Sequence, residues 1–357
     1  MADKLDVSVN ICTYNRCSML GMALESVLSQ QMQEGLRYEV IVVDNNSTDE
    51  TRQLVESVIA RGHENLRYLF EGRQGLSYAR NAAVVAARAP ILAFTDDDVR
   101  VEPDWVETIK VMLDRHPEVD CVGGKVLPRW ISRRPSWLTS EHWAPLGIVD
   151  YGPQPFYVNA EHRLCLLTAN MAIRKDALER VGSFQPALQR VQNRVGSMED
   201  HELQVRLWDD HRQGLYAPEL IVTSPVVAER LSKKYHRRWR LGHGHFYAMA
   251  RLEEMERSQS GWLFGVSAHM YRRAALDALG WLGNLVRGNL TRAFAYEIRL
   301  FFFAGFFTER YRDFRAGAGR SHIRELVRFA RSLTQRLVRG RAVPTRLSAA
   351  ESPPPEL

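Results

Sequence analysis

Three consecutive aspartates form the most distinctive candidate site for chemistry in this sequence. Asp96, Asp97 and Asp98 directly follow the apolar run at residues 91–95. Carboxylate oxygens are the ligands that Mg²⁺ and Mn²⁺ prefer, and such an ion neutralises charge on a departing phosphate group. We therefore expect Asp96 and Asp98 to bind Mn²⁺ or Mg²⁺ together with substrate phosphates. A solvated acidic turn before the helix that starts near Pro103 is the alternative, and the triplet alone does not separate the two.

A second pair of acids, Glu199 and Asp200, lies about a hundred residues later, at the start of a predicted helix. A carboxylate within hydrogen-bond reach of an attacking hydroxyl can take its proton, which contributes on the order of 10²–10⁴-fold to a rate. We predict that Asp200 is such a general base. Acids in the first turn of a helix are also ordinary partners of the helix dipole, so this alternative stays open for the segment taken alone.

A third acid, Asp44, ends the apolar run at residues 38–43. A carboxylate at the end of a buried strand can accept hydrogen bonds from a nucleotide base or a ribose. The residues that follow also favour an Asx turn and a helix cap, in which Ser47 and Glu50 form a capping box. This ordinary explanation accounts for every residue except the choice of aspartate at position 44.

The elements that must position these acids alternate between apolar runs and amphipathic stretches. Strands are expected at residues 7–13, 38–43, 66–70, 91–95, 119–123 and 166–174. Helical patterns lie between them, and this alternation predicts an α/β fold with a mostly parallel sheet flanked by helices. Ligands of such sheets bind beyond the carboxyl ends of the strands. Residues 128–160 are rich in Trp and Pro, so we expect an irregular insertion that forms a lid or an acceptor wall.

Six motifs in this order resemble the family 2 glycosyltransferases, and the resemblance covers residues 5–245. The motifs are VNICTYNR at 9–16, VVDNNSTD at 42–49, GLSYARN at 75–81, the aspartates at 96–98, ANMAIRK at 169–175 and ED at 199–200. The resemblance implies a Rossmann-like fold of the GT-A type. It also implies an inverting transfer of a sugar from a nucleotide diphosphate sugar to an acceptor hydroxyl, with Asp200 as the base.

Site residues follow from the same resemblance, position by position. The implied donor-binding set is Thr13, Tyr14, Asn15, Arg16, Asp44, Asn46, Arg80, Asp96 and Asp97. The implied acceptor-side set is Asn170, Met171 and Glu199. Within the first set, Thr13 and Asp44 would contact the base and the ribose, and Arg80 would lie near the diphosphate. Asp96 and Asp98 would bind the ribose and the metal ion.

Two departures from the family pattern limit what the resemblance implies. Asn45 and Asn46 stand where many members have Asp or Gly, which leaves the choice of donor open. The Q-x-x-R-W motif of processive polysaccharide synthases has no counterpart, because residues 237–240 lack the glutamine. We therefore expect one sugar to be transferred per encounter.

The C-terminal part of the chain is strongly basic. Residues 230–346 contain 24 Lys or Arg against 8 Asp or Glu, although the net charge of the whole chain is only +6. Apolar residues recur there at helical spacing over residues 262–282, 294–306 and 323–337. Such a basic helical appendage can lie on an anionic membrane surface, or it can pack its apolar stripes against the catalytic domain. The dense phenylalanines at 301–303 and 306–307 favour the membrane.

Imidazole groups also gather in this part of the chain, at His236, His243 and His245. We include His236 among the candidate metal ligands, beside Asp96 and Asp98. The alternative is a basic, solvated helix, because histidine binds many partners other than metal.

These observations define an expected organisation of the chain. We expect a catalytic domain at residues 1–245, with a nucleotide-sugar half at about 1–125 and an acceptor half at about 126–245. A basic amphipathic region at 246–340 and a flexible tail at 341–357 follow. The four cysteines form no CxxC pair, and neither a leader nor a spanning segment is evident, so we expect reduced thiols and a cytoplasmic protein at the inner face of the plasma membrane.

Rival functions fit the sequence less well. No G-x-G-x-x-G follows the first strand, which argues against a dinucleotide-dependent dehydrogenase, and the glycine-rich signature of sugar nucleotide pyrophosphorylases is absent. The main alternative is a non-catalytic nucleotide- or nucleic-acid-binding protein with a degenerate GT-A domain. No nucleic-acid-binding motif accompanies the basic end, so we expect no nucleic acid. The expected partners are a nucleotide sugar and a glycan or lipid-linked glycan acceptor, in cell-surface glycan or polysaccharide biosynthesis.

Overall fold

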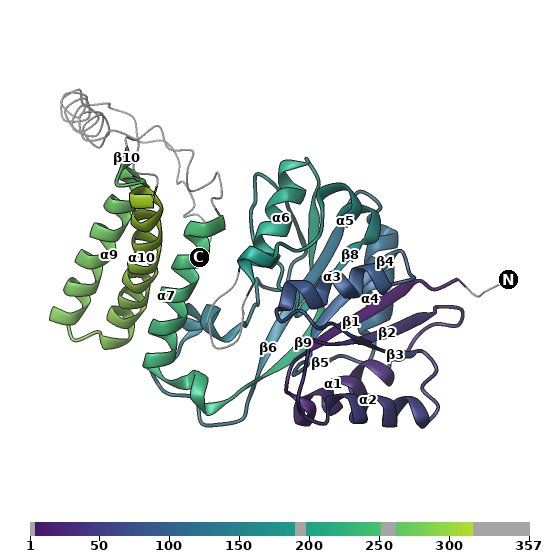
Figure 1. The fold of residues 1–357 in the computed structure, drawn as a ribbon. Coiled ribbons are helices and arrows are strands. Elements are labelled where there is room, and N and C mark those ends of the chain that lie inside the picture. The colour runs from purple at the N-terminus through teal and green to yellow at the C-terminus, as the bar shows by residue number, and fades with distance from the viewer. Residues whose placement is uncertain (1–3, 190–197, 251–261, 317–357) are drawn as a thin grey trace. The chain divides into compact units, whose positions relative to one another are not determined.

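The computed structural model describes residues 4–189, 198–250 and 262–316 (Figure 1). These residues divide into two compact units. The first unit takes in the described residues up to 134, those from 143 to 189, and 198–231; the second takes in 135–142 and the described residues from 232 onward. Residues 232–245, which we expected in the catalytic domain, are therefore part of the second unit.

The first unit is built on a mixed sheet, to which the described residues contribute nine strands. Their order is β3-β2-β1-β4-β8-β6-β9-β5, and β7 pairs with β9. The strands are β1 (Val7–Thr13), β2 (Tyr38–Asp44), β3 (Leu66–Phe70), β4 (Ile91–Asp96), β5 (Arg100–Val101), β6 (Cys121–Trp130), β7 (Phe156–Val158), β8 (Asn170–Arg174) and β9 (Gly214–Val226). The first four strands are mutually parallel, whereas β8 runs antiparallel to both β4 and β6. The predicted α/β class is confirmed.

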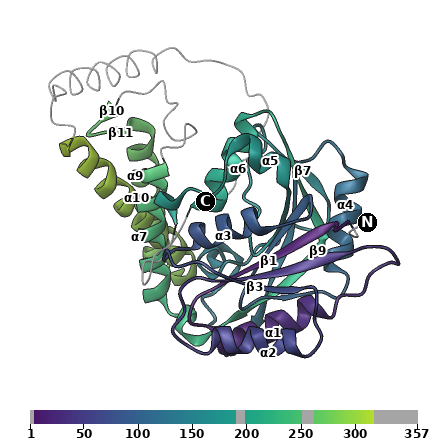
Figure 2. The ribbon, with the colours of Figure 1, turned by 45° about the vertical axis from the view of Figure 1, so that its right-hand side comes forward.

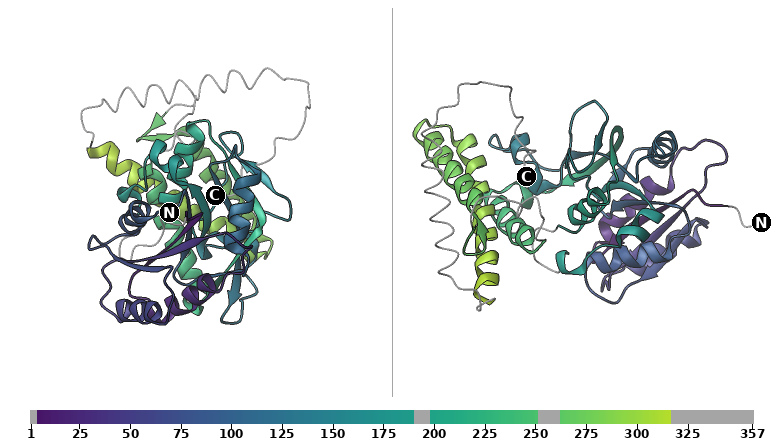
Figure 3. Two further views of the ribbon diagram at one scale, coloured as in Figure 1. Left: turned by 90° about the vertical axis from the view of Figure 1, so that its right-hand side faces the viewer. Right: turned by 90° about the horizontal axis from the view of Figure 1, so that it is seen from above.

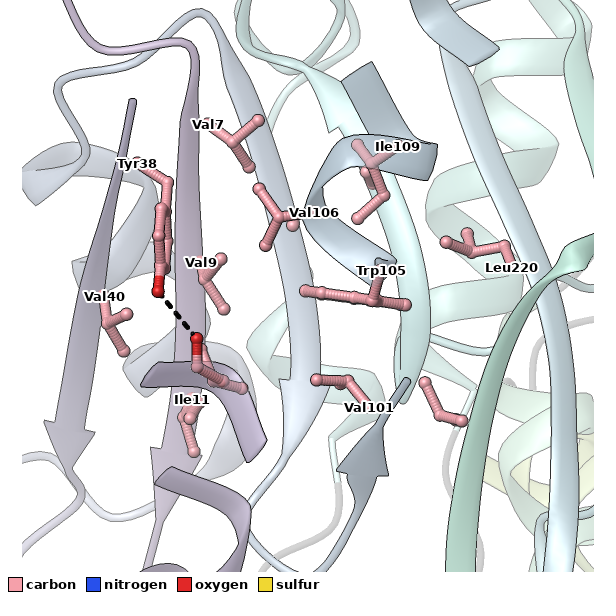
Figure 4. Close-up of a cluster of buried hydrophobic side chains, with 14 of the residues drawn as sticks. Val7, Val9, Ile11, Tyr38, Val40, Val101, Trp105, Val106, Ile109 and Leu220 are labelled. Atoms are coloured by element: carbon pink, nitrogen blue, oxygen red, sulfur yellow. Dashed lines mark hydrogen bonds between the residues drawn. The ribbon is translucent and has the colours of Figure 1, made fainter. Parts of the chain in front are cut away.

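Helices cover both faces of this sheet because successive side chains of a strand point to opposite faces. Val40 and Val42 of β2 pack with helices α1 (Cys17–Leu28), α2 (Thr51–Ala60) and α4 (Trp105–Arg115). Ile41 and Val43 pack on the other side with α3 (Leu76–Ala86), α5 (Lys175–Val181) and α6 (Glu199–Asp209). Figure 2 shows α1 and α2 on one side of the strands and α3 on the other. Figure 4 shows the first of these cores, with the Trp105 ring at its centre.

One local prediction for the first unit needs correction, and one strand was missed. The capping box does not form: α2 begins at Thr51, and the Thr51 amide donates to Asp49 Oδ1 at 3.1 Å. Ser47 is used elsewhere, because its hydroxyl accepts the amide of Asn15 at 3.0 Å. The long strand β9 was also not predicted, since two prolines interrupt its sequence.

The described residues of the second unit form three helices: α7 (Lys233–Ala250), α9 (Ala268–Val286) and α10 (Leu290–Ala316). A short hairpin of β10 (Trp262–Leu263) and β11 (Val266–Ser267) precedes α9. Helix α10 packs against both α7 and α9, and Figure 3 shows α9 and α10 side by side in green and yellow-green. In the parts of the chain that the structure describes, no helix is both long and apolar enough to cross a bilayer. The predicted stripe at 323–337 and the tail at 341–357 lie outside the described residues.

Two glycines allow α7 and α10 to approach closely. A Cβ added to Gly244 of α7 would overlap backbone atoms of Phe302 and Phe306, and one added to Gly305 of α10 would overlap the carbonyl group of Leu241. Each glycine therefore lies directly against the backbone of the partner helix.

We expect Gly244→Ala and Gly305→Ala each to lower the free energy of unfolding by about 1–3 kcal/mol, because a backbone cannot yield as a flexible side chain can. Urea denaturation measures this loss. Gly283→Ala in α9 is the matched control, since its added Cβ would meet no described atom within 4 Å. It should raise stability by about 0.5–1 kcal/mol, as alanine does inside a helix. Equal effects at the three positions would contradict the close approach.

Candidate active site

The carboxyl ends of three parallel strands bring the predicted donor residues to one edge of the sheet. Thr13 at the end of β1 lies opposite Asp44 at the end of β2, and Cys12 lies opposite Asp96 at the end of β4. In sheets of this connectivity, ligands bind beyond these ends, where the order of the strands reverses. The edge formed by β1, β2 and β4 is therefore the natural place for a nucleotide.

The three aspartates at this edge have different environments. Asp97 is buried and accepts hydrogen bonds from the Thr13 hydroxyl at 2.8 Å and from Arg16 Nη1 at 2.9 Å. Burial raises its pKa to about 6, although the charge of Arg16 opposes the shift. The same Arg16 nitrogen is 3.0 Å from Asp98 Oδ2. Asp96 is the exposed member, with 45% of its side chain accessible. The middle aspartate thus ties β4 to the loop after β1, and Asp96 faces solvent.

Asp44 is also buried and already engaged. Its two oxygens accept the Ser47 amide at 2.8 Å and the Tyr68 hydroxyl at 2.7 Å. Burial and this bond raise the pKa of Tyr68. No motif predicted a role for Tyr68, which lies on β3 beside β2. Its hydroxyl fixes the orientation of the Asp44 carboxylate.

The loops after β1 and β2 are joined to each other by hydrogen bonds. The side-chain oxygen of Asn15 accepts the Thr48 amide at 2.7 Å. Asn15 and Asn46 both have positive φ angles, 50° and 64°, in the left-handed region that asparagine tolerates better than most residues. The resemblance placed both asparagines in the donor-binding set, and the structure gives each of them a part in shaping these loops.

Arg80 of α3 connects the donor edge to the acceptor half. Its side chain is buried and donates from Nη1 to Glu199 Oε1 at 2.8 Å and from Nη2 to the Thr168 hydroxyl at 2.6 Å. Asp96 Oδ1 is 4.0 Å from Nη2. Burial by itself would lower the pKa of Arg80, but the carboxylates of Glu199, Asp96 and Asp200 raise it. One guanidinium therefore stands between acids of β4 and acids of α6. The sequence analysis did not predict Thr168, which accepts a hydrogen bond from Arg80 just as Glu199 does.

Asp200 lies in the first turn of α6 and is half-buried, with the His201 amide donating to its Oδ1 at 3.0 Å. An aromatic residue of the Trp- and Pro-rich insertion lies close by. The Tyr151 hydroxyl donates to the carbonyl oxygen of Cys165 at 2.9 Å. The side-chain amide Nε2 of Gln204 donates to Cys165 Sγ at 3.8 Å and to the carbonyl oxygen of Asp200 at 3.0 Å. Burial is the main cause of the raised pKa of Tyr151, and the charge of Asp200 adds to it.

A comparison with protein families decides what kind of protein carries this arrangement. Residues 8–182 match the model of glycosyl transferase family 2. These residues place the chain in glycosyl transferase family 2. The matched segment contains β1, β2 and β4 with the donor residues at their ends, and it also contains Arg80 and Thr168.

Named relatives of this family 2 glycosyltransferase occur in archaea and bacteria. The glucosyl-dolichyl phosphate glucuronosyltransferase of Haloferax volcanii is 30% identical over 182 residues, which cover 50% of this chain and 56% of that protein. The succinoglycan biosynthesis protein ExoM of Rhizobium meliloti is 26% identical over 246 residues, 68% of this chain and 75% of that protein. The glycosyltransferase AglE of Haloferax volcanii is 31% identical over 50% of this chain and 55% of its own length. This chain thus spans just over half the length of the two Haloferax relatives.

Solved structures support the fold. The mannosyltransferase PcManGT from Pyrobaculum calidifontis, in complex with GDP-Man and Mn²⁺, superposes with a TM-score of 0.51 at 17% identity. The match covers 94% of this chain and 81% of that one. At this identity the likeness concerns the GT-A fold alone, and the fold predicted from the motifs is confirmed.

Two predicted site residues of this family 2 glycosyltransferase lie in the core of the first unit. Asn170 is fully buried: its Oδ1 accepts Trp105 Nε1 at 2.7 Å, and its Nδ2 donates to the carbonyl oxygens of Lys125 and Leu220 at 2.8 Å each. Met171 lies in the core. Both side chains hold the sheet together, so their assignment to the acceptor side stays a prediction. Tyr14 is 40% exposed beside the donor edge.

The predicted metal ligand His236 belongs to the second unit, so it stays a prediction. It is buried in α7, with ring centroids 5.1 Å from Trp137 and 6.3 Å from Phe294. Among the described residues, no group of three or more His, Cys, Asp or Glu side chains could hold a metal ion by itself.

Proposed function

We propose that this chain transfers a sugar from a nucleotide diphosphate sugar to an acceptor hydroxyl, with inversion at the anomeric carbon. The observation that supports the proposal is the position of Arg80 between Asp96 on the donor edge and Glu199 and Asp200 on α6. A buried cation between two sets of carboxylates attracts both sets and offsets the repulsion between them. Such a site can attract a diphosphate on one side and an acceptor hydroxyl on the other.

The donor would bind at the ends of β1, β2 and β4. Thr13 and Asp44 would contact the base and ribose, and Arg80 would lie near the diphosphate. PcManGT, which shares the fold, binds GDP-Man. Because the loops around Asn15 and Asn46 are fixed by their own hydrogen bonds, we expect a preformed nucleotide pocket.

Asp96 and Asp98 fit a divalent cation by their chemistry, because Mg²⁺ and Mn²⁺ bind through one or two carboxylates and the substrate phosphates. Asp96 is the exposed member of the pair, and Asp98 is oriented by Arg16. When bound, the ion would neutralise charge on the leaving diphosphate. PcManGT was solved with Mn²⁺, which supports the same use here.

Asp200 would act as the general base. Its carboxylate takes the proton of the acceptor hydroxyl while that oxygen forms a bond to the anomeric carbon. The bond from the anomeric carbon to the diphosphate oxygen breaks, and the nucleoside diphosphate leaves with the electron pair. Attack from the opposite face inverts the configuration.

The acceptor is proposed to be a glycan or a lipid-linked glycan in polysaccharide or cell-surface glycan biosynthesis. Two relatives support this class, since one is named for succinoglycan biosynthesis and another for a glucosyl-dolichyl phosphate substrate.

The decisive experiment measures nucleotide release from a panel of UDP-, GDP- and dTDP-sugars with Mn²⁺ or Mg²⁺, with mixed glycan and lipid-linked acceptors. We expect turnover of one donor class, loss of turnover with EDTA, and a product whose anomeric configuration, measured by NMR, is opposite to that of the donor. Binding of nucleotide without turnover of any donor would instead favour the non-catalytic alternative.

We expect Tyr151 to form part of the acceptor wall. Its ring is 36% exposed, and its hydroxyl and backbone are held by bonds to Cys165 and Tyr216. Sugar rings stack on such fixed aromatic faces. Tyr151→Ala should raise the KM for the acceptor about tenfold, which corresponds to about 1.4 kcal/mol.

The control for this prediction is Tyr157→Ala. Tyr157 is similarly exposed, at 40%, but its hydroxyl donates to Glu118 instead. The control should leave the KM for the acceptor unchanged. If Tyr151→Ala changed only the KM for the donor, the acceptor wall would have to be assigned elsewhere.

A further inference from the structure

The outer face of α9 carries an unusual stripe of exposed aliphatic side chains. The exposed fractions are 55% for Leu276, 66% for Leu279, 53% for Leu282 and 82% for Val286. Spacings of three and four residues bring these side chains to one side of the helix. A single exposed leucine is ordinary, but a row of four along one helix marks a contact surface.

The opposite side of α9 is already occupied by α10. A Cβ added to Gly280 would overlap the Tyr296 ring, and Asp277 forms an ion pair with Arg299 at 3.1 Å. Asp277 and Gly280 are three residues apart and mark the inner side of the helix. The aliphatic stripe therefore does not contribute to the packing of the helical hairpin.

The phenylalanines that sequence reasoning assigned to a membrane have a different role. Phe302, Phe303 and Phe306 are buried, and Phe302 contacts the rings of Tyr247 and His243. Phe302 and Phe306 lie between α10 and α7. Five of the nine exposed large hydrophobic residues that the structure describes in the second unit lie on α9 instead.

Positive charge surrounds the aliphatic stripe. Arg272 and Arg273 are exposed near one end of α9, and Arg287 and Arg292 are exposed near the other. Between residues 262 and 296 the sequence has one acid, Asp277, which is already paired with Arg299. Exposed arginines thus flank the aliphatic stripe near both ends of α9, and the one nearby carboxylate is paired with Arg299 on the inner side.

We propose that the outer face of α9 docks on an anionic lipid surface, with its leucines in the headgroup layer and its arginines against lipid phosphates. A helix with an apolar face and basic flanks has the composition of an interfacial helix. Each basic side chain near an anionic bilayer adds attraction that salt screens. This proposal does not rest on the proposed sugar transfer.

Charge distinguishes the bilayer from two other occupants. A second copy of this chain would bring α9 against α9, and either orientation would place arginines near arginines. The C-terminal residues 317–357 contain eight arginines and three glutamates, so they carry the same sign of charge as the face they would cover. An anionic bilayer offers both apolar volume and opposite charge.

The test is co-sedimentation of the full chain with phosphatidylcholine vesicles, either pure or containing about 30% of the anionic lipid phosphatidylglycerol. Each is measured at about 50 mM and about 500 mM salt, because salt screens the attraction. We expect binding to the anionic vesicles at low salt, and a large loss at high salt. Leu279→Ser/Leu282→Ser/Val286→Ser and Arg272→Gln/Arg273→Gln/Arg287→Gln should each weaken binding, the latter about a hundredfold.

Matched controls use residues of the first unit. Val85→Ser removes a comparably exposed aliphatic group from α3, and Arg52→Gln/Arg61→Gln removes exposed arginines near α2. Both should bind vesicles as the wild type does. Circular dichroism verifies that each variant is folded.

Three outcomes would overturn the proposal. One is no binding to anionic vesicles at low salt, and another is equal binding to neutral vesicles. The third is a change from dimer to monomer in the serine variant, measured by analytical ultracentrifugation, with vesicle binding unchanged, which would assign the face to a second copy. Nucleotide release in solution is measured in parallel and should be the same in all folded variants, which separates this test from that of the transferase activity.

Discussion

Asp200→Asn is expected to lower kcat for sugar transfer by about 10²–10⁴-fold, because an amide cannot take the proton of the acceptor hydroxyl. The substitution is nearly isosteric and keeps an oxygen that can accept the His201 amide. The affinity for the donor, measured by isothermal titration calorimetry with a nucleoside diphosphate, should therefore stay the same. The pattern of a lost rate with unchanged donor affinity separates a base from a donor-binding residue.

Asp209→Asn provides the control within the same helix. Asp209 lies at the other end of α6, where it pairs with Arg163 at 3.0 Å on the surface. This variant should transfer sugar at the wild-type rate. If Asp200→Asn retained the wild-type rate, the role of general base would have to pass to another acid.

Glu199→Ala should lower the free energy of unfolding by about 3–5 kcal/mol, because it leaves the buried charge of Arg80 without its main partner. The side chains of Arg80 and Glu199 are only 6% and 2% exposed, and their ion pair measures 2.8 Å. Urea denaturation of the wild type and the variant measures the difference. Glu199→Gln keeps a hydrogen-bond acceptor for Arg80, so it should lower the free energy of unfolding by less than Glu199→Ala does.

The matched control is an ion pair of nearly the same length in a different setting. Arg52 and Glu56 are 2.7 Å apart on the surface of α2, with side chains 67% and 51% exposed. Glu56→Ala should change the free energy of unfolding by less than about 1 kcal/mol, since exposed pairs contribute little. If the two glutamate variants lost equal stability, burial would not be what makes the Arg80 pair important.

Much of the donor half could be predicted because its signals are local. The first four strands, β1 to β4, end within one residue of where hydrophobic patterning placed them. The carboxyl ends of β1, β2 and β4 carry polar residues that the motifs identified. A parallel sheet requires those ends to meet at one edge, so the pattern determined the location of Thr13, Asp44 and Asp96 as well.

The roles within the acidic triplet could not be predicted, because three identical neighbouring residues differ only in their tertiary partners. Thr13 and Arg16 both donate hydrogen bonds to Asp97, which is therefore buried and joins β4 to β1 and the loop after it. Asp96 stays exposed. Tyr68 and Thr168 escaped notice for a similar reason. Each is an ordinary residue of its segment until folding brings it to Asp44 or Arg80.

Composition was also a poor guide to the surface of the second unit. Phenylalanines are more conspicuous in the sequence than leucines, but Phe302 and Phe306 fill the space between helices, whereas Leu279 is exposed. Which apolar stripe of a helix is covered depends on how many neighbours the helix has. Among the described helices of the second unit, α10 packs extensively against both α7 and α9, whereas α9 packs extensively only against α10.

The insertion of β8 between β4 and β6 has a consequence for the growing chain on the ribosome. β4 is completed at Asp96, but its neighbour β8 begins only at Asn170. At a synthesis rate of about 5–20 residues per second, β4 stays an unpaired edge for roughly 4–15 s after it is made. Such an edge can pair with strands of other nascent chains. During the interval between these two strands, the free edge of β4 is therefore open to mispairing.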